Sequence, residues 1–94
     1  MNIIRLKFDK TLIALSGNEF GYNTYLNQIK EKLDMNQKNV IVFDNTIILI
    51  AISFVKGMVS DLVEKYTIKE LKSKIDFQCF TRELENMIWE AVEF

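Results

Sequence analysis

The side chains best placed for chemistry are an aspartate and a serine that each follow an apolar run. Residues 40–43 end at Asp44, and residues 47–52 lead into Ser53. A helical pattern starts at Ser53, so this serine stands where a helix N-terminus offers free N–H groups and partial positive charge. Such a junction can carry a phosphoserine or bind an anion. The alternatives are an N-cap hydroxyl for Ser53 and, for Asp44, a turn residue that accepts bonds from its own backbone.

The other reactive residue types exclude several classes of site. The 94 residues include no histidine and one cysteine, Cys79. They therefore contain no serine–histidine or cysteine–histidine pair, no zinc-ligand cluster and no intramolecular disulfide. We find no paired carboxylates beside a credible pocket and no glycine-rich phosphate loop. We expect a protein that is not an enzyme and has no cofactor or metal site, with Cys79 acting as a small buried hydrophobe.

Composition and charge limit the partners. Twelve basic and thirteen acidic residues give a net charge of -1, which argues against a nucleic-acid surface built on bulk charge. The same near-neutrality leaves self-association unopposed, so a weak or stable homodimer is expected. The longest apolar run, residues 47–52, is far shorter than the roughly 20 residues that span a bilayer. The N-terminal segment also lacks the apolar core of a signal peptide. These features predict a cytoplasmic protein without a membrane segment.

The chain is expected to form one domain over residues 1–94, because it has no proline, three glycines and no low-complexity tract. Residues 3–8 alternate between apolar and polar side chains, which predicts a half-exposed strand. Residues 40–43 do not alternate, which is typical of a central parallel strand covered on both faces. Further strands are predicted over residues 11–15 and 75–79.

Three helices are predicted. Ser16 and Glu19 have the spacing of a capping box in front of a helix over residues 17–34. The second helix begins near Ser53, and the third follows Thr81 as its N-cap. Each helix carries one apolar stripe. The stripes are Tyr22, Leu26, Ile29 and Leu33, then Val55, Met58, Val59, Leu62 and Tyr66, then Leu84, Met87, Ile88 and Ala91.

The order strand–strand–helix–strand–helix–strand–helix predicts an α/β domain with a mixed sheet of about four to five strands and three helices. With so few helices, all of them can lie on one face. The chain resembles the STAS-like domains, small bacterial relatives of the domain found in sulfate transporters and anti-sigma factor antagonists. The resemblance covers roughly residues 12–93. It rests on Ser-Gly-Asn-Glu-Phe-Gly at 16–21, Val-Ile-Val-Phe-Asp at 40–44, Ser-Phe at 53–54 and Lys-Ile-Asp-Phe at 74–77.

The resemblance implies a STAS-like fold and a regulatory module that binds a protein partner. Its relatives suggest a histidine-kinase-like ATPase or another switch protein as that partner. In anti-sigma factor antagonists the strand–helix junction reads Asp-Ser-Ser-Gly, and one serine is phosphorylated. Here the corresponding position falls on or near Ile52, one residue before Ser53, and the aspartate is missing. The resemblance implies a helix start that faces a partner, whereas this departure leaves open whether Ser53 is phosphorylated.

The predicted interaction site is the face of the second helix together with nearby polar and aromatic residues. Lys56 follows a buried stripe position and is expected to be solvated. Gly57 costs about 1 kcal/mol of helix propensity relative to alanine, so either something packs closely there or the glycine is merely tolerated. Trp89 lies about 140° from Leu84 on the helical wheel. The predicted site residues are Asp44, Ser53, Phe54, Lys56, Gly57 and Trp89.

Two points stay open at the level of sequence. Trp89 is either an interface anchor or a side chain that folds over the rim of its own sheet. The function is either the regulatory interaction described above or that of a small inhibitor or ligand-binding protein, encoded by a phage or mobile element, that acts on a host enzyme. The abundance of lysine, asparagine and isoleucine suits an AT-rich genome and does not separate the two.

Overall fold

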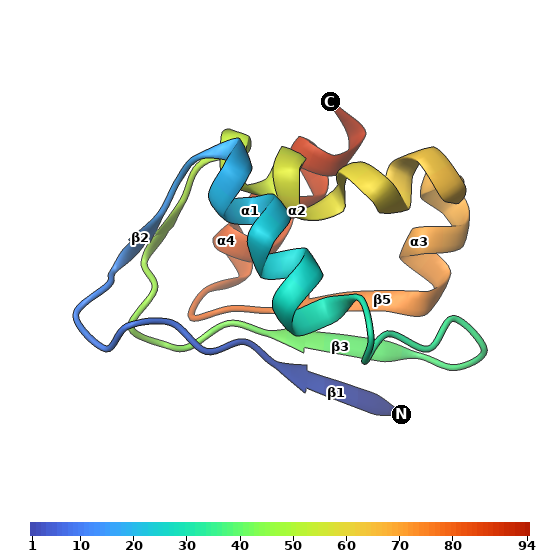
Figure 1. Cartoon of the computed structure of the whole chain (residues 1–94), viewed down its shortest axis with the longest axis horizontal. Coiled ribbons are helices and arrows are strands. Elements are labelled where there is room, and N and C mark those ends of the chain that lie inside the picture. Colours follow the sequence, from blue (N-terminus) through green and yellow to red (C-terminus); the bar gives the residue numbers. More distant parts are fainter.

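Five strands and four helices form this α/β domain (Figure 1). The computed structural model describes residues 1–94. The strands are β1 (Asn2–Arg5), β2 (Ala14–Leu15), β3 (Asn39–Val42), β4 (Leu49–Ile50) and β5 (Ile75–Gln78). The helices are α1 (Asn18–Thr24), which continues as a π-helical turn (Tyr25–Ile29), then α2 (Ile52–Lys65), α3 (Ile68–Lys74) and α4 (Arg82–Glu93). The predicted α/β class is confirmed, whereas the helix count is four and not three.

All strand pairs are parallel, so the predicted mixed sheet is wrong. β1, β3 and β5 form one sheet in that order, and β2 and β4 form a second, smaller sheet. β1 and β2 follow one another in the chain but are not paired. Parallel neighbours need long crossover connections, and here α1, α2 and α3 lie in those connections.

The two sheets are successive parts of one bent ribbon. Asn2 lies opposite Asn39, and Ala14 lies opposite Leu49. Residues 6–13 connect β1 to β2, and residues 43–48 connect β3 to β4. The segments that lead to β2 and β4 both turn away from the three-stranded sheet and run side by side (Figure 1). As a result, α1 and α2, which follow β2 and β4, begin at the same end of the molecule.

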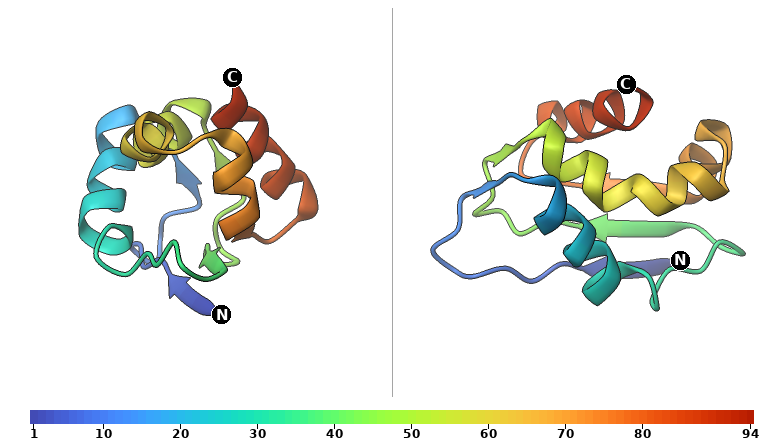
Figure 2. Two further views of the ribbon diagram at one scale, coloured as in Figure 1. Left: turned by 90° about the vertical axis from the view of Figure 1, so that its right-hand side faces the viewer. Right: turned by 45° about the horizontal axis from the view of Figure 1, so that its top comes forward.

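The helices cover one face of the three-stranded sheet, and the other face is open (Figure 2). On β3 the side chain of Ile41 is buried, and so is Phe43 directly after the strand, whereas Val40 and Val42 are only half-buried. The prediction of a strand covered on both faces is therefore wrong. An unbroken apolar run conceals the difference, because it looks the same whether one face or two are covered. The inward side chains join a single core of 20 buried residues.

The helices α1 and α2 cross in close contact, which two glycines allow. A Cβ atom built on Gly57 would lie 1.9 Å from the backbone oxygen of Asn18, and one built on Gly21 would lie 2.0 Å from that of Phe54. No real Cβ tolerates such distances, so each helix leaves room for the backbone of the other. Close packing, and not mere tolerance, explains the glycine at position 57.

The start and end of the first helix differ from prediction. Gly17, at φ 98°, is the N-cap residue, and no side chain caps the helix. A positive φ suits glycine and turns the chain sharply after β2, so Ser16 and Glu19 do not form the expected capping box. Tyr25 then opens the π-helical turn, and the regular helix stops well before the predicted residue 34.

The additional helix, α3, carries the capping box that the chain does use. Thr67 Oγ1 accepts a bond from the Glu70 N–H at 3.1 Å, and Glu70 Oε1 accepts one from the Thr67 N–H at 2.9 Å. The spacing Thr-x-x-Glu was a visible signal for this helix. At the last helix the prediction is confirmed, because Thr81 Oγ1 accepts a bond from the Leu84 N–H at 3.2 Å.

A fully buried asparagine connects the segments at the end of the sheet where β1, β3 and β5 begin. Asn39 is 0% exposed, and its Oδ1 accepts bonds from Asn2 Nδ2 and the Asp34 N–H. Its Nδ2 donates to the carbonyl oxygens of Asp34, Gln37 and Lys74. With both amide atoms satisfied, the side chain links β1, the loop before β3 and the end of α3 without leaving a buried polar atom unpaired.

Adding a methyl group at the helix crossing should destabilise the protein. In an open helix Gly57→Ala would stabilise by about 1 kcal/mol, because alanine is the best helix former. Here the methyl group meets the Asn18 backbone, so we expect a loss of roughly 2–3 kcal/mol, and the same for Gly21→Ala. Urea unfolding followed by circular dichroism measures this. Val63→Ala, at an exposed position of α2, is the control, and a gain in stability for either glycine variant would contradict the close crossing.

The two serine/threonine positions with capping-box spacing should respond differently. Thr67→Ala removes a real cap and should cost about 1 kcal/mol. Ser16→Ala removes no cap and should stay within about 0.5 kcal/mol of the wild type. The same unfolding measurement compares them. Equal losses at the two positions would show that Ser16 does cap α1.

Candidate interaction surface

Ser53 lies in the first turn of α2, where it connects the two helix starts. The N-cap of α2 is Ala51, and no side chain caps the helix. Ser53 Oγ instead accepts a bond from the Gly17 N–H at 2.9 Å. The N-cap interpretation of Ser53 is therefore wrong. Its hydroxyl contacts the junction between β2 and α1, 36 positions away in the chain. The bond holds that junction against the start of α2.

Four large apolar side chains lie exposed around this junction. Their exposed fractions are 55% for Ile13, 54% for Ile48, 61% for Leu49 and 54% for Ile52. The carbonyl oxygen of Ile13 accepts bonds from the N–H groups of Ile48 and Leu49, so these residues are direct neighbours. Ile52 is the first residue of α2. We call this set the ribbon-tip patch.

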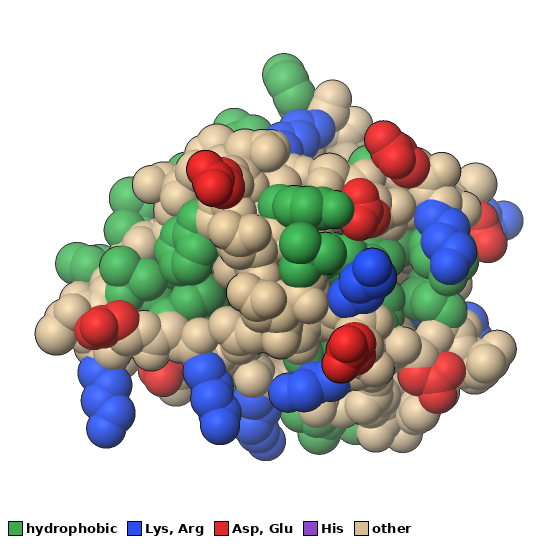
Figure 3. Space-filling view, in the orientation of Figure 1, with side chains coloured by type: hydrophobic (Ala, Val, Ile, Leu, Met, Phe, Trp, Pro, Cys, Tyr) green, Lys and Arg blue, Asp and Glu red, His purple; other side chains and the backbone are tan.

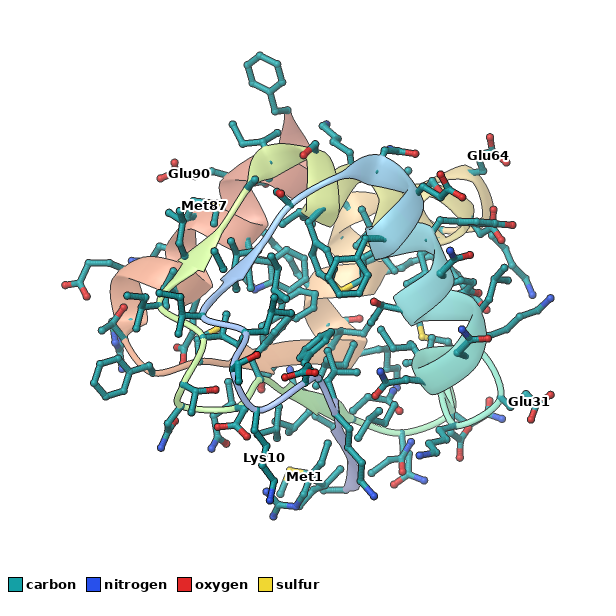
Figure 4. The ribbon with its side chains drawn as sticks, turned by 60° about the vertical axis from the view of Figure 1, so that its left-hand side comes forward. Met1, Lys10, Glu31, Glu64, Met87 and Glu90 are labelled. Atoms are coloured by element: carbon teal, nitrogen blue, oxygen red, sulfur yellow. The ribbon has the colours of Figure 1, made fainter.

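The pictures place the patch at one end of the molecule. Apolar side chains gather at the left end in Figure 3, over β2 and β4, whereas lysine and arginine side chains line the lower edge. Figure 4 looks toward that end, with the two ribbon strands in front. Met87 and Glu90 of α4 flank the ribbon on one side, and Lys10 lies below it.

Folding alone does not account for the residue types in this patch. In the same run Ile47 and Ile50 point inward and are 1% and 2% exposed, so they supply what the core needs. Ile48 and Leu49 point to solvent, where polar side chains would serve the fold equally well. Single exposed hydrophobes are common, but several side by side mark an interaction site. The sequence concealed them, because alternation cannot be recognised in an all-apolar run.

Two of the predicted site residues support this surface from within. Phe54 is fully buried, and its ring meets Phe20 edge to face at 5.3 Å between centroids. Gly57 is buried at the helix crossing. Neither residue is available on the surface in this structure. Their contribution is to seat the start of α2 against α1.

Lys56 lies one helical turn beyond Ile52, on the same side of α2. Its side chain is half-buried and not fully solvated as expected. Its Nζ lies 5.5 Å from the centroid of the Phe94 ring, and Phe94 is 92% exposed. The structure therefore brings Ser53 and Lys56 next to the ribbon-tip patch and adds an exposed aromatic ring beside them.

Asp44 and Trp89 are not part of this surface. Asp44 Oδ1 accepts a bond from the Thr46 N–H at 3.0 Å, so Asp44 is the turn residue that the sequence offered as one alternative. Trp89 packs edge to face on Phe77 of β5 at 5.1 Å and lies beneath the ammonium of Lys72 at 5.7 Å. The indole thus folds over the rim of its own sheet.

Other reactive groups do not form a site here. Burial, with a smaller contribution from the charge of Glu85, raises the pKa of the Cys79 thiol to about 12, so the thiol stays protonated at neutral pH. The cysteine is half-buried, which is less than expected. No group of three or more potential metal ligands comes together. None of the helices is long and apolar enough to cross a bilayer.

Comparison with protein-family models, with curated proteins and with solved structures finds no match to this chain. The resemblance to STAS-like domains therefore stays a hypothesis. What the structure itself contributes is a pair of parallel strands that present the starts of α1 and α2, with an apolar patch around the serine that joins them.

Removing the Ser53 hydroxyl should loosen the junction without unfolding the protein. Ser53→Ala leaves the Gly17 N–H without its partner, and we expect a loss of roughly 0.5–1 kcal/mol in the free energy of unfolding. The amide proton of Gly17 should exchange faster with solvent, as measured by NMR. Ser53→Thr keeps a hydroxyl and should restore the protection. Unchanged exchange in Ser53→Ala would show that the bond is not formed in solution.

Proposed function

We propose that this chain is a non-enzymatic interaction module that binds a regulatory protein partner through the ribbon-tip patch and the adjoining start of α2. The observation that carries the proposal is the cluster of four apolar side chains, each more than half exposed, around the junction of two strands and two helices. Such side chains gain free energy when a partner removes them from water. They lie on paired backbone, which keeps them in place before binding.

The resemblance to STAS-like domains supports the same end of the same helix. In that family the strand–helix junction meets the partner, which suggests a histidine-kinase-like ATPase or another switch protein. Position 52, on or near the place that corresponds to the phosphorylated serine, holds an exposed isoleucine. We propose that binding here depends on apolar contact and not on phosphorylation, with Lys56 contributing a charge at the margin of the surface.

Charge placed in the patch should abolish partner binding and leave the fold intact. Leu49→Glu and Ile48→Glu each put a carboxylate where a partner would exclude water, and losses above 2 kcal/mol of binding free energy are typical of such central positions. The matched control is Val63→Glu, which makes the same change at a 40% exposed position near the other end of α2. Affinity purification from the native host, followed by titration with the recovered protein, compares the variants.

Thermal melts must show that all three variants are folded. If Leu49→Glu and Ile48→Glu keep every partner that the wild type binds, the patch is not the binding surface. Lys56→Glu should weaken binding less than the patch variants, because that charge lies at the margin. A phosphate on Ser53 in protein from the host would contradict binding without phosphorylation.

Self-association is the other use of an apolar surface on a chain with a net charge of -1. Sedimentation velocity of the wild type and of Leu49→Glu distinguishes the two uses. A dimer that Leu49→Glu converts to a monomer would assign the patch to a second copy of this chain. A wild-type monomer at high micromolar concentration would leave the patch free for a different protein.

A further inference from the structure

A second feature lies at the opposite end of α2. A cavity of about 630 Å³ opens between the segment that follows α1 and the last turn of α2. Its volume falls within the range of small-molecule sites. Its lining residues are Tyr25, Lys30, Leu33, Asp34, Met35, Asn36, Asp61, Leu62, Lys65 and Tyr66. None of these residues belongs to the ribbon-tip patch.

The π-helical turn shapes one wall of this cavity. Lys30 N–H donates to the Tyr25 carbonyl oxygen at 2.8 Å, so the turn closes over five residues and is wider than an α-helical turn. Such turns are rare, and they often occur at functional sites. Here the turn places Tyr25 at its start and Lys30 just beyond its end, both on the cavity.

Tyr25 is a buried side chain with a free hydroxyl. The residue is only 7% exposed, and its hydroxyl makes no hydrogen bond within the protein. No buried side-chain oxygen or nitrogen lacks a partner, so this unpaired hydroxyl oxygen is accessible to solvent, and the residue lines the cavity. Burial, and then the charge of Asp61, raises the pKa of Tyr25. The group therefore remains a hydrogen-bond donor at neutral pH.

The acidic side chains around the cavity accept hydrogen bonds within the protein, whereas the basic ones form no ion pair. Asp34 accepts bonds from the Asn36 N–H and from Gln37 Nε2, and one oxygen of Asp61 accepts the Tyr22 hydroxyl. Lys30 and Lys65 form no ion pair, because the only ion pairs join Lys38 to Asp76 and Lys72 to Glu93, but Lys65 Nζ lies 5.5 Å from the centroid of the Tyr66 ring. Glu31 and Glu64, next to these lysines in sequence, point out into solvent (Figure 4).

We propose that this cavity binds a small aromatic carboxylate. The donors among the lining residues are the ammonium groups of Lys30 and Lys65 and the Tyr25 hydroxyl, groups that suit an anionic oxygen pair. The remaining wall combines the side chains of Asp34, Asn36 and Asp61 with an apolar part, in which Leu62 is buried and Leu33, Met35 and Tyr66 are half-buried. A flat apolar ring fits against that wall while its carboxylate faces the donors. This ligand site is independent of the ribbon-tip patch.

The test uses 2-naphthoate as the probe and 2-naphthalenemethanol as its uncharged counterpart. Titration of each into isotope-labelled wild-type protein, followed by amide NMR shifts, reports where and how tightly they bind. We expect naphthoate to move the amides of the cavity lining, with saturation in the millimolar range or below. The alcohol should bind at least about tenfold more weakly, because it lacks the charge that the lysines recognise.

Variants assign the contacts. Tyr25→Phe keeps the ring and removes the hydroxyl, and Lys65→Gln removes one charge, so each should weaken naphthoate binding about tenfold and leave the alcohol unchanged. Lys72→Gln, on α3 and paired with Glu93, is the matched control and should bind like the wild type. No movement of the lining amides at millimolar naphthoate, equal binding of the two probes, or shifts confined to other surfaces would each overturn the proposal.

Discussion

The close crossing of α1 and α2 is the constraint on which the rest of the structure depends. At Gly21 and Gly57 each helix lies against the backbone of the other, a contact that any larger residue would prevent. With the helices this close, the strands that lead into them must also be neighbours. β2 and β4 therefore pair, and the ribbon bends away from the main sheet to reach that position. The Ser53 hydroxyl then joins the two helix starts.

The arrangement of the three-stranded sheet depends on a buried polar side chain. Asn39 satisfies both of its amide atoms against three separate segments, which fixes the start of the central strand relative to its neighbours. A buried amide that is fully bonded specifies one arrangement, because any shift in register would leave it unpaired at a cost of several kcal/mol. The helices cover only one face of this sheet, so the central valines stay partly open to solvent.

The two candidate sites lie at opposite ends of α2 and differ in chemistry. Its N-terminal end carries exposed apolar side chains on paired backbone, a surface suited to another protein. Its C-terminal end borders a cavity lined by the Tyr25 hydroxyl, two lysines and two aspartates, the space proposed above for a small aromatic carboxylate. The helix between them packs against both α1 and α4, so the ends that border the two sites are held on a rigid element.

The sequence by itself determined the α/β class, the position of the central strand, the start of α4 at Thr81 and the absence of histidine-dependent chemistry. These features depend on local periodicity and residue type, which can be read without knowing what lies nearby. The Thr67 cap was equally local and could have been found. Tertiary structure alone decided that β2 pairs with β4, that Gly57 meets a backbone, that Ser53 bonds to Gly17, and that half of the run 47–52 faces solvent. Each of these depends on a partner distant in the chain, and an apolar or glycine residue looks the same in the sequence whether that partner is a helix, a strand or water.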